Sequence, residues 1–92
     1  MVISMLNKYK YLIGLKHFSI KKHDLVKWSL KPNETYFIVD IYTFHGNPGC
    51  FHDRIKLRNI ETKKVIDTSM IMFSDCEVYR KARWQSAIVI EY

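Results

Sequence analysis

Glycine, proline and cysteine are scarce in this 92-residue chain, which has three, two and two of them. With so few chain breakers, the turns must be few or built around Asn and Asp. Cys50 and Cys76 are too few for a disulfide framework, and we expect both to be reduced thiols in a cytoplasmic protein. No apolar run approaches the roughly 20 residues that cross a bilayer, and residues 1–6 lack the layout of a signal peptide. We therefore expect no membrane partner.

Acidic residues are nearly absent from one part of the chain. Between residues 8 and 31, Asp24 is the only acid against seven lysines, whereas residues 32–92 hold eight basic and eight acidic side chains. The whole formal net charge of +6 therefore arises in the N-terminal third. Such a surface attracts phosphate polyanions through Coulomb attraction and counterion release. This indicates a class of partner but no reaction.

Aromatic and β-branched segments predict a mainly β protein. The length suits a single domain, residues 1–92. Strands are predicted at residues 35–44, 51–59, 65–73 and 87–92, with a further strand entered at Leu25 after a turn. We expect a small antiparallel barrel or strongly bent sheet of five to six strands, built from residues 18–92. A short helical turn capped by Ser74 is the only helix expected.

The first 16 residues fit two structures. Tyr9, Tyr11 and Ile13 alternate with polar neighbours as in a strand, whereas residues 3–13 also show partial helical spacing. We expect an added strand or helix here and favour the strand, because Tyr and Ile prefer a pleated surface. Gly14 ends either element.

The middle of the chain resembles SH3-like small barrels. A charged turn at residues 21–24 leads into an apolar strand, the hydrophobic strand at 36–41 follows, and a hairpin then forms around Glu61-Thr62-Lys63. The resemblance extends over about half the chain. It implies a small barrel of a kind that binds nucleic acid or peptides.

Basic residues alternate along the strand predicted at 51–59. Arg54, Lys56 and Arg58 share one face, with their side chains about 7 Å apart. This spacing is close to the phosphate repeat of an extended nucleic-acid strand. The alternative interpretation is the solvent face of an edge strand, where Lys and Arg deter aggregation.

The strand at 35–44 has a polar face and a core face in strict alternation. Asp40 marks the polar face, which then also holds Tyr36, Ile38, Tyr42 and Phe44; the core face holds Phe37, Val39, Ile41 and Thr43. If this strand pairs with 51–59, aromatic and basic residues share one surface. The alternative is that the rings cover a second small core.

Three further segments place cations beside rings or beside one another. Tyr9 lies between Lys8 and Lys10, and Lys21 and Lys22 are adjacent. A basic cluster near the C-terminus comprises Arg80, Lys81 and Arg83. Our hypothesis is that the clusters converge on one face.

The combined pattern predicts a non-catalytic protein that binds RNA or single-stranded nucleic acid. Flat aromatic β surfaces suit unpaired bases, and the sequence has no helix-turn-helix signals. Predicted phosphate contacts are Lys8, Lys10, Lys21, Lys22, Arg54, Lys56 and Arg58. Predicted stacking rings are Tyr9, Tyr36 and Tyr42.

Metal binding and catalysis have weaker support. His45, Cys50 and His52 fall within eight residues, but their spacing matches no paired zinc-ligand pattern. The acids Asp40, Asp53 and Asp67 are scattered, and the sequence has no phosphate-cradling glycine loop. We expect no metal, no cofactor and no enzymatic activity.

Two alternatives to nucleic-acid binding are open. The size and the lysine- and isoleucine-rich composition resemble accessory proteins of large phages, which implies an inhibitor or antitoxin-like adaptor that docks on a host protein, with or without bridging RNA. The other alternative is a structural subunit, a homodimer for example, whose exposed strand edges pair with a second copy.

Overall fold

The computed structural model describes residues 8–45 and 51–91. Within these ranges the chain forms eight strands and no helix. The strands are β1 (Tyr9–Ile13), β2 (Lys16–Ser19), β3 (Leu25–Trp28), β4 (Tyr36–His45), β5 (Phe51–Asn59), β6 (Val65–Ser69), β7 (Asp75–Arg80) and β8 (Arg83–Glu91). The prediction of a mainly β chain is confirmed, and Tyr9–Ile13 is a strand rather than a helix.

All eight strands belong to one antiparallel sheet in the order β2-β1-β8-β7-β3-β4-β5-β6. The edge strands β2 and β6 do not pair with each other, so the sheet is open. The expected five- to six-stranded SH3-like barrel is therefore not supported. The strand count was too low because the short, polar β2 and β7 carry little apolar signal; the strands entered at Leu25 and predicted at 87–92 are present as β3 and β8, and β8 begins earlier, at Arg83.

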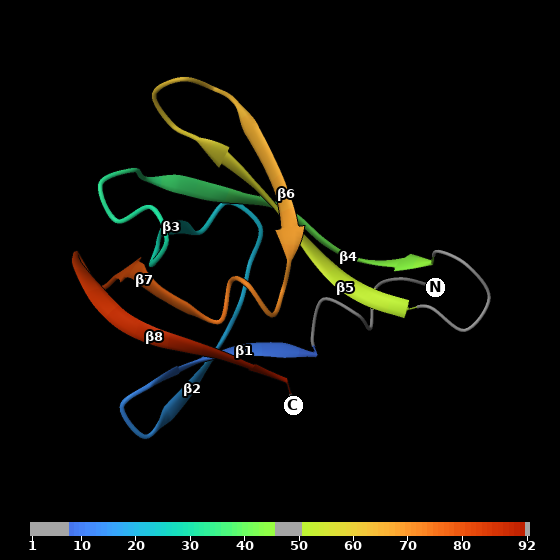
Figure 1. The fold of residues 1–92 in the computed structure, drawn as a ribbon. Coiled ribbons are helices and arrows are strands. Elements are labelled where there is room, and N and C mark those ends of the chain that lie inside the picture. Colours follow the sequence, from blue (N-terminus) through green and yellow to red (C-terminus); the bar gives the residue numbers. More distant parts are fainter. Residues whose placement is uncertain (1–7, 46–50, 92) are drawn as a thin grey trace.

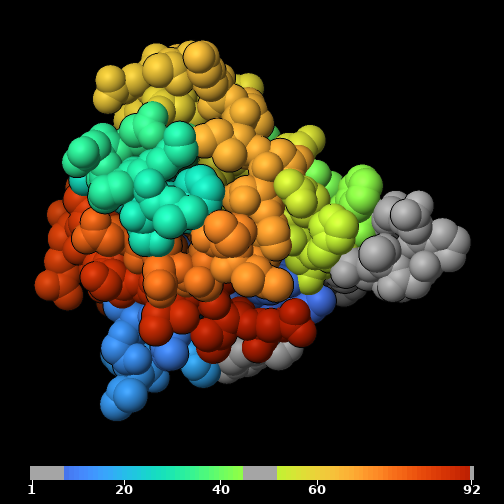
Figure 2. Space-filling model, viewed as in Figure 1, coloured from blue at the N-terminus to red at the C-terminus, as the bar shows by residue number. Residues whose placement is uncertain are grey.

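The sheet bends strongly, so that β1 and β8 lie across from β4 and β5 (Figure 1). We call the concave side the inner face and the other side the outer face. The β1–β2 hairpin projects from the lower edge of the molecule, and the orange segment around β6 and β7 fills the front (Figure 2). None of the described segments forms a helix with the length and apolarity that membrane crossing requires.

Inward-pointing side chains of the strands form the core. Its largest fully buried members include Tyr11 from β1, Tyr36 from β4 and Phe73 from the turn between β6 and β7. The ring centroids of Trp28 and Phe73 lie 6.4 Å apart, and Trp28 Nε1 donates a hydrogen bond of 2.8 Å to the carbonyl of Met72. This turn therefore covers the inner face. The strand predicted at 65–73 ends four residues early, and β7 begins where the short helical turn was expected.

A β-bulge in β4 changes which residues of that strand face inward. The register with β5 shifts between Ile38 and Asp40, so Val39 is an extra residue. Tyr36 and Ile38 consequently point into the core together with Ile41. The strict alternation predicted for this strand is wrong before the bulge, because one additional residue inverts the pattern.

The turns follow the sequence signals more closely. Gly14, with φ of +62°, lies in the two-residue turn between β1 and β2, where a glycine tolerates the left-handed backbone. In the turn after β5, Asn59 accepts hydrogen bonds from the backbone N–H groups of Glu61 and Thr62 at 2.8 and 3.0 Å. The breaks predicted at residues 14, 21–24 and 59–64 are confirmed.

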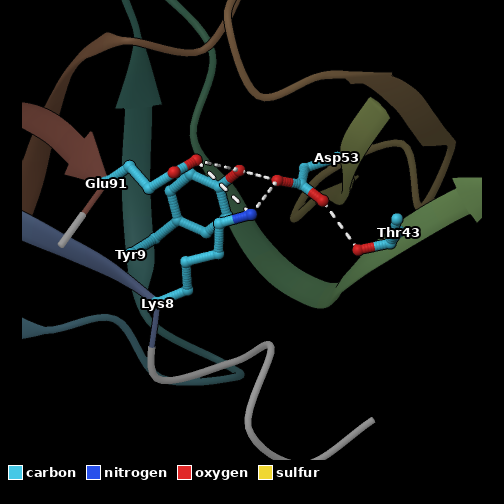
Figure 3. A network of polar contacts seen from close by, with 5 residues as sticks. All are labelled: Lys8, Tyr9, Thr43, Asp53 and Glu91. Atoms are coloured by element: carbon cyan, nitrogen blue, oxygen red, sulfur yellow. Dashed lines mark hydrogen bonds and ion pairs between the residues drawn. The ribbon is translucent and has the colours of Figure 1, made fainter. Parts of the chain in front are cut away.

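A polar network joins the two halves of the bent sheet (Figure 3). Asp53, on the inner face of β5, accepts hydrogen bonds from the Tyr9 hydroxyl of β1 and from Thr43 of β4, the latter at 2.7 Å. Lys8 Nζ lies 3.0 Å from Asp53 and 3.4 Å from Glu91 of β8. The network connects strands that are far apart in the sheet order and thereby holds the bend.

Candidate nucleic-acid interface

The outer face of β4 and β5 brings aromatic rings and cations into register. We call this surface the ring-and-cation face and define it by Phe37, Tyr42, Phe44, His52, Arg54, Lys56 and Arg58. Three cross-strand pairs place a ring of β4 opposite a basic or imidazole group of β5: Phe37 with Arg58, Tyr42 with Arg54, and Phe44 with His52. Alternation on two paired strands is what collects them on one side.

The cations lie close to the rings. Arg58 Cζ is 5.7 Å from the centroid of Phe37, and Lys56 Nζ is 5.4 Å from that of Tyr42. Both distances are within the range of a cation–π interaction. Among the described residues, neither Lys56 nor Arg58 forms an ion pair. Lys56 lies directly opposite Asp40 and Asp67 in the ladder, whereas Arg58 lies opposite Phe37 and Val65.

The far end of the face carries an exposed pair of rings. The centroids of Phe44 and His52 lie 5.1 Å apart with an interplanar angle of 32°. Phe44 is 45% exposed, so a large part of its ring is accessible to solvent. This end therefore offers a flat, partly apolar surface to a ligand.

Asp67 of β6 fixes two members of the face. It accepts a hydrogen bond from the Tyr42 hydroxyl and one of 2.7 Å from Arg54 Nε, and its backbone carbonyl accepts from Arg54 Nη2 at 3.1 Å. The hydrogen bond to Asp67 raises the pKa of Tyr42. Burial opposes ionisation of Asp67, but the bonds from Tyr42 and Arg54 outweigh it and lower its pKa. Arg54 is thus largely committed to Asp67, whereas the Tyr42 ring is held in place.

The turn between β2 and β3 extends the face at its other end. Lys22 Nζ lies 3.6 Å from Asp40 of β4. The His23 ring packs edge-on against Phe37 with centroids 5.8 Å apart. His23 has φ of +72°, so the turn holds these side chains over β4 by a backbone conformation that few residues adopt.

The structure separates the ten predicted site residues. Five of them gather at the ring-and-cation face and its extension: Lys22, Tyr42, Arg54, Lys56 and Arg58. Lys21 lines a cavity next to that turn. Lys10 lies on the outer face of β1, opposite Ser19 and Ile90, and four strands lie between β1 and β5 in the sheet order. The predicted convergence of all basic clusters on one face is therefore wrong.

Two predicted stacking residues are buried. Tyr36 is 1% exposed and its hydroxyl donates to Glu34 at 3.0 Å, while Tyr9 is 8% exposed and donates to Asp53. Neither ring can stack on a base. Lys8 is engaged by Asp53 and Glu91, so its predicted role as a free phosphate contact is also corrected.

Sequence reasoning assigned Phe37 to the core and treated His52 only as a metal-ligand candidate. The bulge at Val39 is the reason that Phe37 was assigned to the wrong face. The sequence held one indication of it: Ile38 falls on the face predicted to be polar, three residues before Ile41, so the apolar alternation breaks between them.

A metal site gains no support from the described residues, which contain no cluster of three or more His, Cys, Asp or Glu side chains that could hold an ion. Cys50, a member of the candidate group, lies outside the described residues. Cys76 is a free, buried thiol, and burial raises its pKa to about 12. It is therefore a protonated core residue rather than a nucleophile.

Comparison with known proteins adds no identification. No family model, no curated protein and no solved structure matches this chain. The function must therefore be argued from the geometry above.

Proposed function

We propose that this protein is a small, non-catalytic nucleic-acid-binding module that uses the ring-and-cation face. Within that class, we propose a single-stranded ligand, and RNA in particular. The observation that carries the proposal is the cross-strand register that places Phe37, Tyr42 and Phe44 opposite Arg58, Arg54 and His52.

The register supplies alternating contacts for bases and phosphates. Successive pairs on the same face of a ladder are about 7 Å apart, so an extended strand can follow the ladder at about one nucleotide per pair. Bases would stack on Phe44 and Tyr42, and each stacked base contributes about 1–3 kcal/mol. Lys56 and Arg58, which form no ion pair within the described part of the chain, would contact the phosphates.

A single strand fits this surface better than a duplex. Reading a duplex through its major groove usually requires an inserted helix or a separate two-stranded ribbon; the described ranges contain no helix, and β4 and β5 are inner strands of the sheet, between β3 and β6. Partly exposed rings on a sheet are accessible only to unstacked bases. The 2′-hydroxyl adds a donor and acceptor that the exposed His52 can contact.

The test is a double charge reversal on β5. Lys56→Glu with Arg58→Glu should weaken binding of a 12-nucleotide poly(U) RNA by at least about tenfold at ~50 mM salt. It should also reduce the steepness of the salt dependence by about 1.4, because each single-strand phosphate contact contributes about 0.7 to the log–log slope. Fluorescence anisotropy across a salt series measures both quantities.

The matched control is Lys63→Glu with Lys64→Glu, which makes the same change in net charge on the exposed β5–β6 turn. It should cost less affinity, because Lys63 and Lys64 lie in the turn beyond the end of the β4–β5 ladder and are opposite none of its rings. Absence of detectable RNA binding by the unmodified protein at ~50 mM salt would refute the proposal. Equal losses in the two double variants would show that only net charge matters.

The docking alternative predicts a different outcome. A protein partner retained on the immobilised chain after nuclease treatment, with no RNA recovered, would favour direct protein–protein docking and count against nucleic-acid binding by the ring-and-cation face. Partner loss after nuclease treatment would instead indicate bridging by RNA.

A further inference from the structure

A second basic feature lies apart from the ring-and-cation face. A cavity of about 700 Å³ opens between the β1–β2 hairpin and the β7–β8 hairpin, and we call it the hairpin pocket. Five cationic side chains and one carboxylate line it: Lys16, Lys21, Arg80, Lys81, Arg83 and Asp24. So strong an excess of one sign in a concave site focuses the field on a negatively charged ligand.

The single carboxylate is already occupied. Arg80 Nη2 lies 2.9 Å from Asp24 Oδ2 and donates to the carbonyl of Ser19 at 2.8 Å. Within the described part of the chain, the other four cations of the pocket form no ion pair. Arg80 Nε is buried and has no hydrogen-bond partner. The pocket thus holds more donor capacity than the chain itself satisfies.

The β7–β8 hairpin concentrates charge at a cost to folding. Arg80 and Arg83 are directly opposite in the ladder, and like charges in that arrangement repel. The two turn residues between them, Lys81 and Ala82, have φ of 55° and 62°, in the left-handed region that Asn-Gly turns normally occupy. A bound anion would offset the repulsion between these three cations and the strain of the two-residue turn.

The aromatic lining of the pocket indicates which group is attached to the anion. Phe18, half-buried, lines the same cavity, whereas the ring of Tyr79 packs against Trp84 on the outer face of the β7–β8 hairpin. A ring beside a cluster of cations suits a planar base attached to a phosphate. The volume falls within the range of about 300–1,000 Å³ that small-molecule sites occupy.

We propose that the hairpin pocket binds a nucleotide through its phosphomonoester, with the base against Phe18. The nucleotide is either a free mononucleotide or the terminal, phosphorylated nucleotide of a strand. The second source rests on the proposed function. The geometry allows a strand to reach from the face to the pocket, because Lys21 lines the pocket and the adjacent Lys22 contacts Asp40 next to the ring-and-cation face.

The experiment titrates adenosine 5′-monophosphate into the labelled protein in phosphate-free buffer, followed by NMR. Chemical shifts should move at Phe18 and Arg83, and adenosine and inorganic phosphate should each bind at least tenfold more weakly. Lys81→Ser with Arg83→Ser should weaken binding at least tenfold. Lys16→Ser, on the other hairpin, should weaken it severalfold, so the outcome does not depend on folding of one turn. Lys63→Ser with Lys64→Ser is the control and should change nothing.

Two further comparisons distinguish a free nucleotide from a strand end, and the hairpin pocket from the ring-and-cation face. If a 5′- or 3′-phosphorylated poly(U) strand binds at least fivefold more tightly than its hydroxyl-ended form, and the monophosphate competes for that gain, the pocket takes a strand end. If the ends make no difference while the monophosphate binds, it takes a free nucleotide. Monophosphate binding no tighter than adenosine or inorganic phosphate, or unaffected by the pocket variants, overturns the inference. RNA binding that persists then leaves the ring-and-cation face standing alone.

Discussion

The two faces of β5 carry similar side-chain triads with different consequences. On the inner face, Asp53 is bound by Tyr9 and Lys8; on the outer face, Asp67 is bound by Tyr42 and Arg54. The inner triad joins residues about half the chain apart, whereas the outer one joins three neighbouring strands. The same tyrosine, carboxylate and cation chemistry thus holds the bend in one place and positions a ring of the ring-and-cation face in the other.

Burial explains the difference. The Asp53 side chain is 14% exposed and that of Asp67 is 33% exposed. A charge withdrawn from water depends on its partners, whereas an exposed one is solvated and screened when they are lost. We therefore expect the inner triad to contribute to stability and the outer one to contribute mainly to geometry.

Removing the inner carboxylate should have the largest effect. Asp53→Asn keeps the side-chain shape but removes the charge that holds Tyr9 and Lys8, and it should lower the free energy of unfolding by about 2 kcal/mol. Asp67→Asn is the matched change on the outer face and should cost under about 1 kcal/mol. Urea unfolding followed by tryptophan fluorescence measures both. A larger loss for Asp67→Asn would contradict the assignment of the inner triad to stability.

Acid should weaken the inner triad. Burial disfavours ionised Asp53, but the bonds from Tyr9, Thr43 and Lys8 outweigh it, so its pKa is lower in the folded state than in the unfolded chain. Its contribution is then full above the unfolded carboxylate pKa of about 4 and is lost as the pH falls through the lower folded value. Urea midpoints between pH 7 and pH 2 should fall less steeply in Asp53→Asn than in the unmodified protein. If the urea midpoints of the two proteins fell equally steeply with pH, Asp53 would not contribute to the acid dependence of stability.

Local patterns predicted the strands and turns that depend on neighbouring residues. The long apolar run at 36–44, the Arg54, Lys56 and Arg58 alternation and the Asn59 turn all have local causes, and each appears at its predicted place. The outer-face cations could be found because an alternating strand needs only its own sequence to separate two faces.

The remaining features depend on contacts that no local pattern contains. The extra residue at Val39 inverts half of β4, which buries Tyr36 and places the half-buried Phe37 on the outer face. The bend brings Tyr9 to Asp53 from 44 positions away, so a ring predicted to stack on a base instead donates to a carboxylate that the sequence presented only as one of three scattered acids. The hairpin pocket likewise combines cations from both ends of the chain, which were visible only as separate clusters.

The smallest expected effect concerns the hydroxyl of Tyr42. Tyr42→Phe loses the bond to Asp67 but keeps the ring, so it should cost about 0.5–1 kcal/mol of stability and change poly(U) affinity less than about twofold. Tyr42→Ala also loses the stacking surface and should reduce affinity about fivefold or more. Anisotropy titrations at one salt concentration compare the two. Equal losses would mean that the hydroxyl or its partner Asp67, and not the aromatic ring, contacts the ligand, and the outer triad would then act in binding directly rather than by positioning a ring.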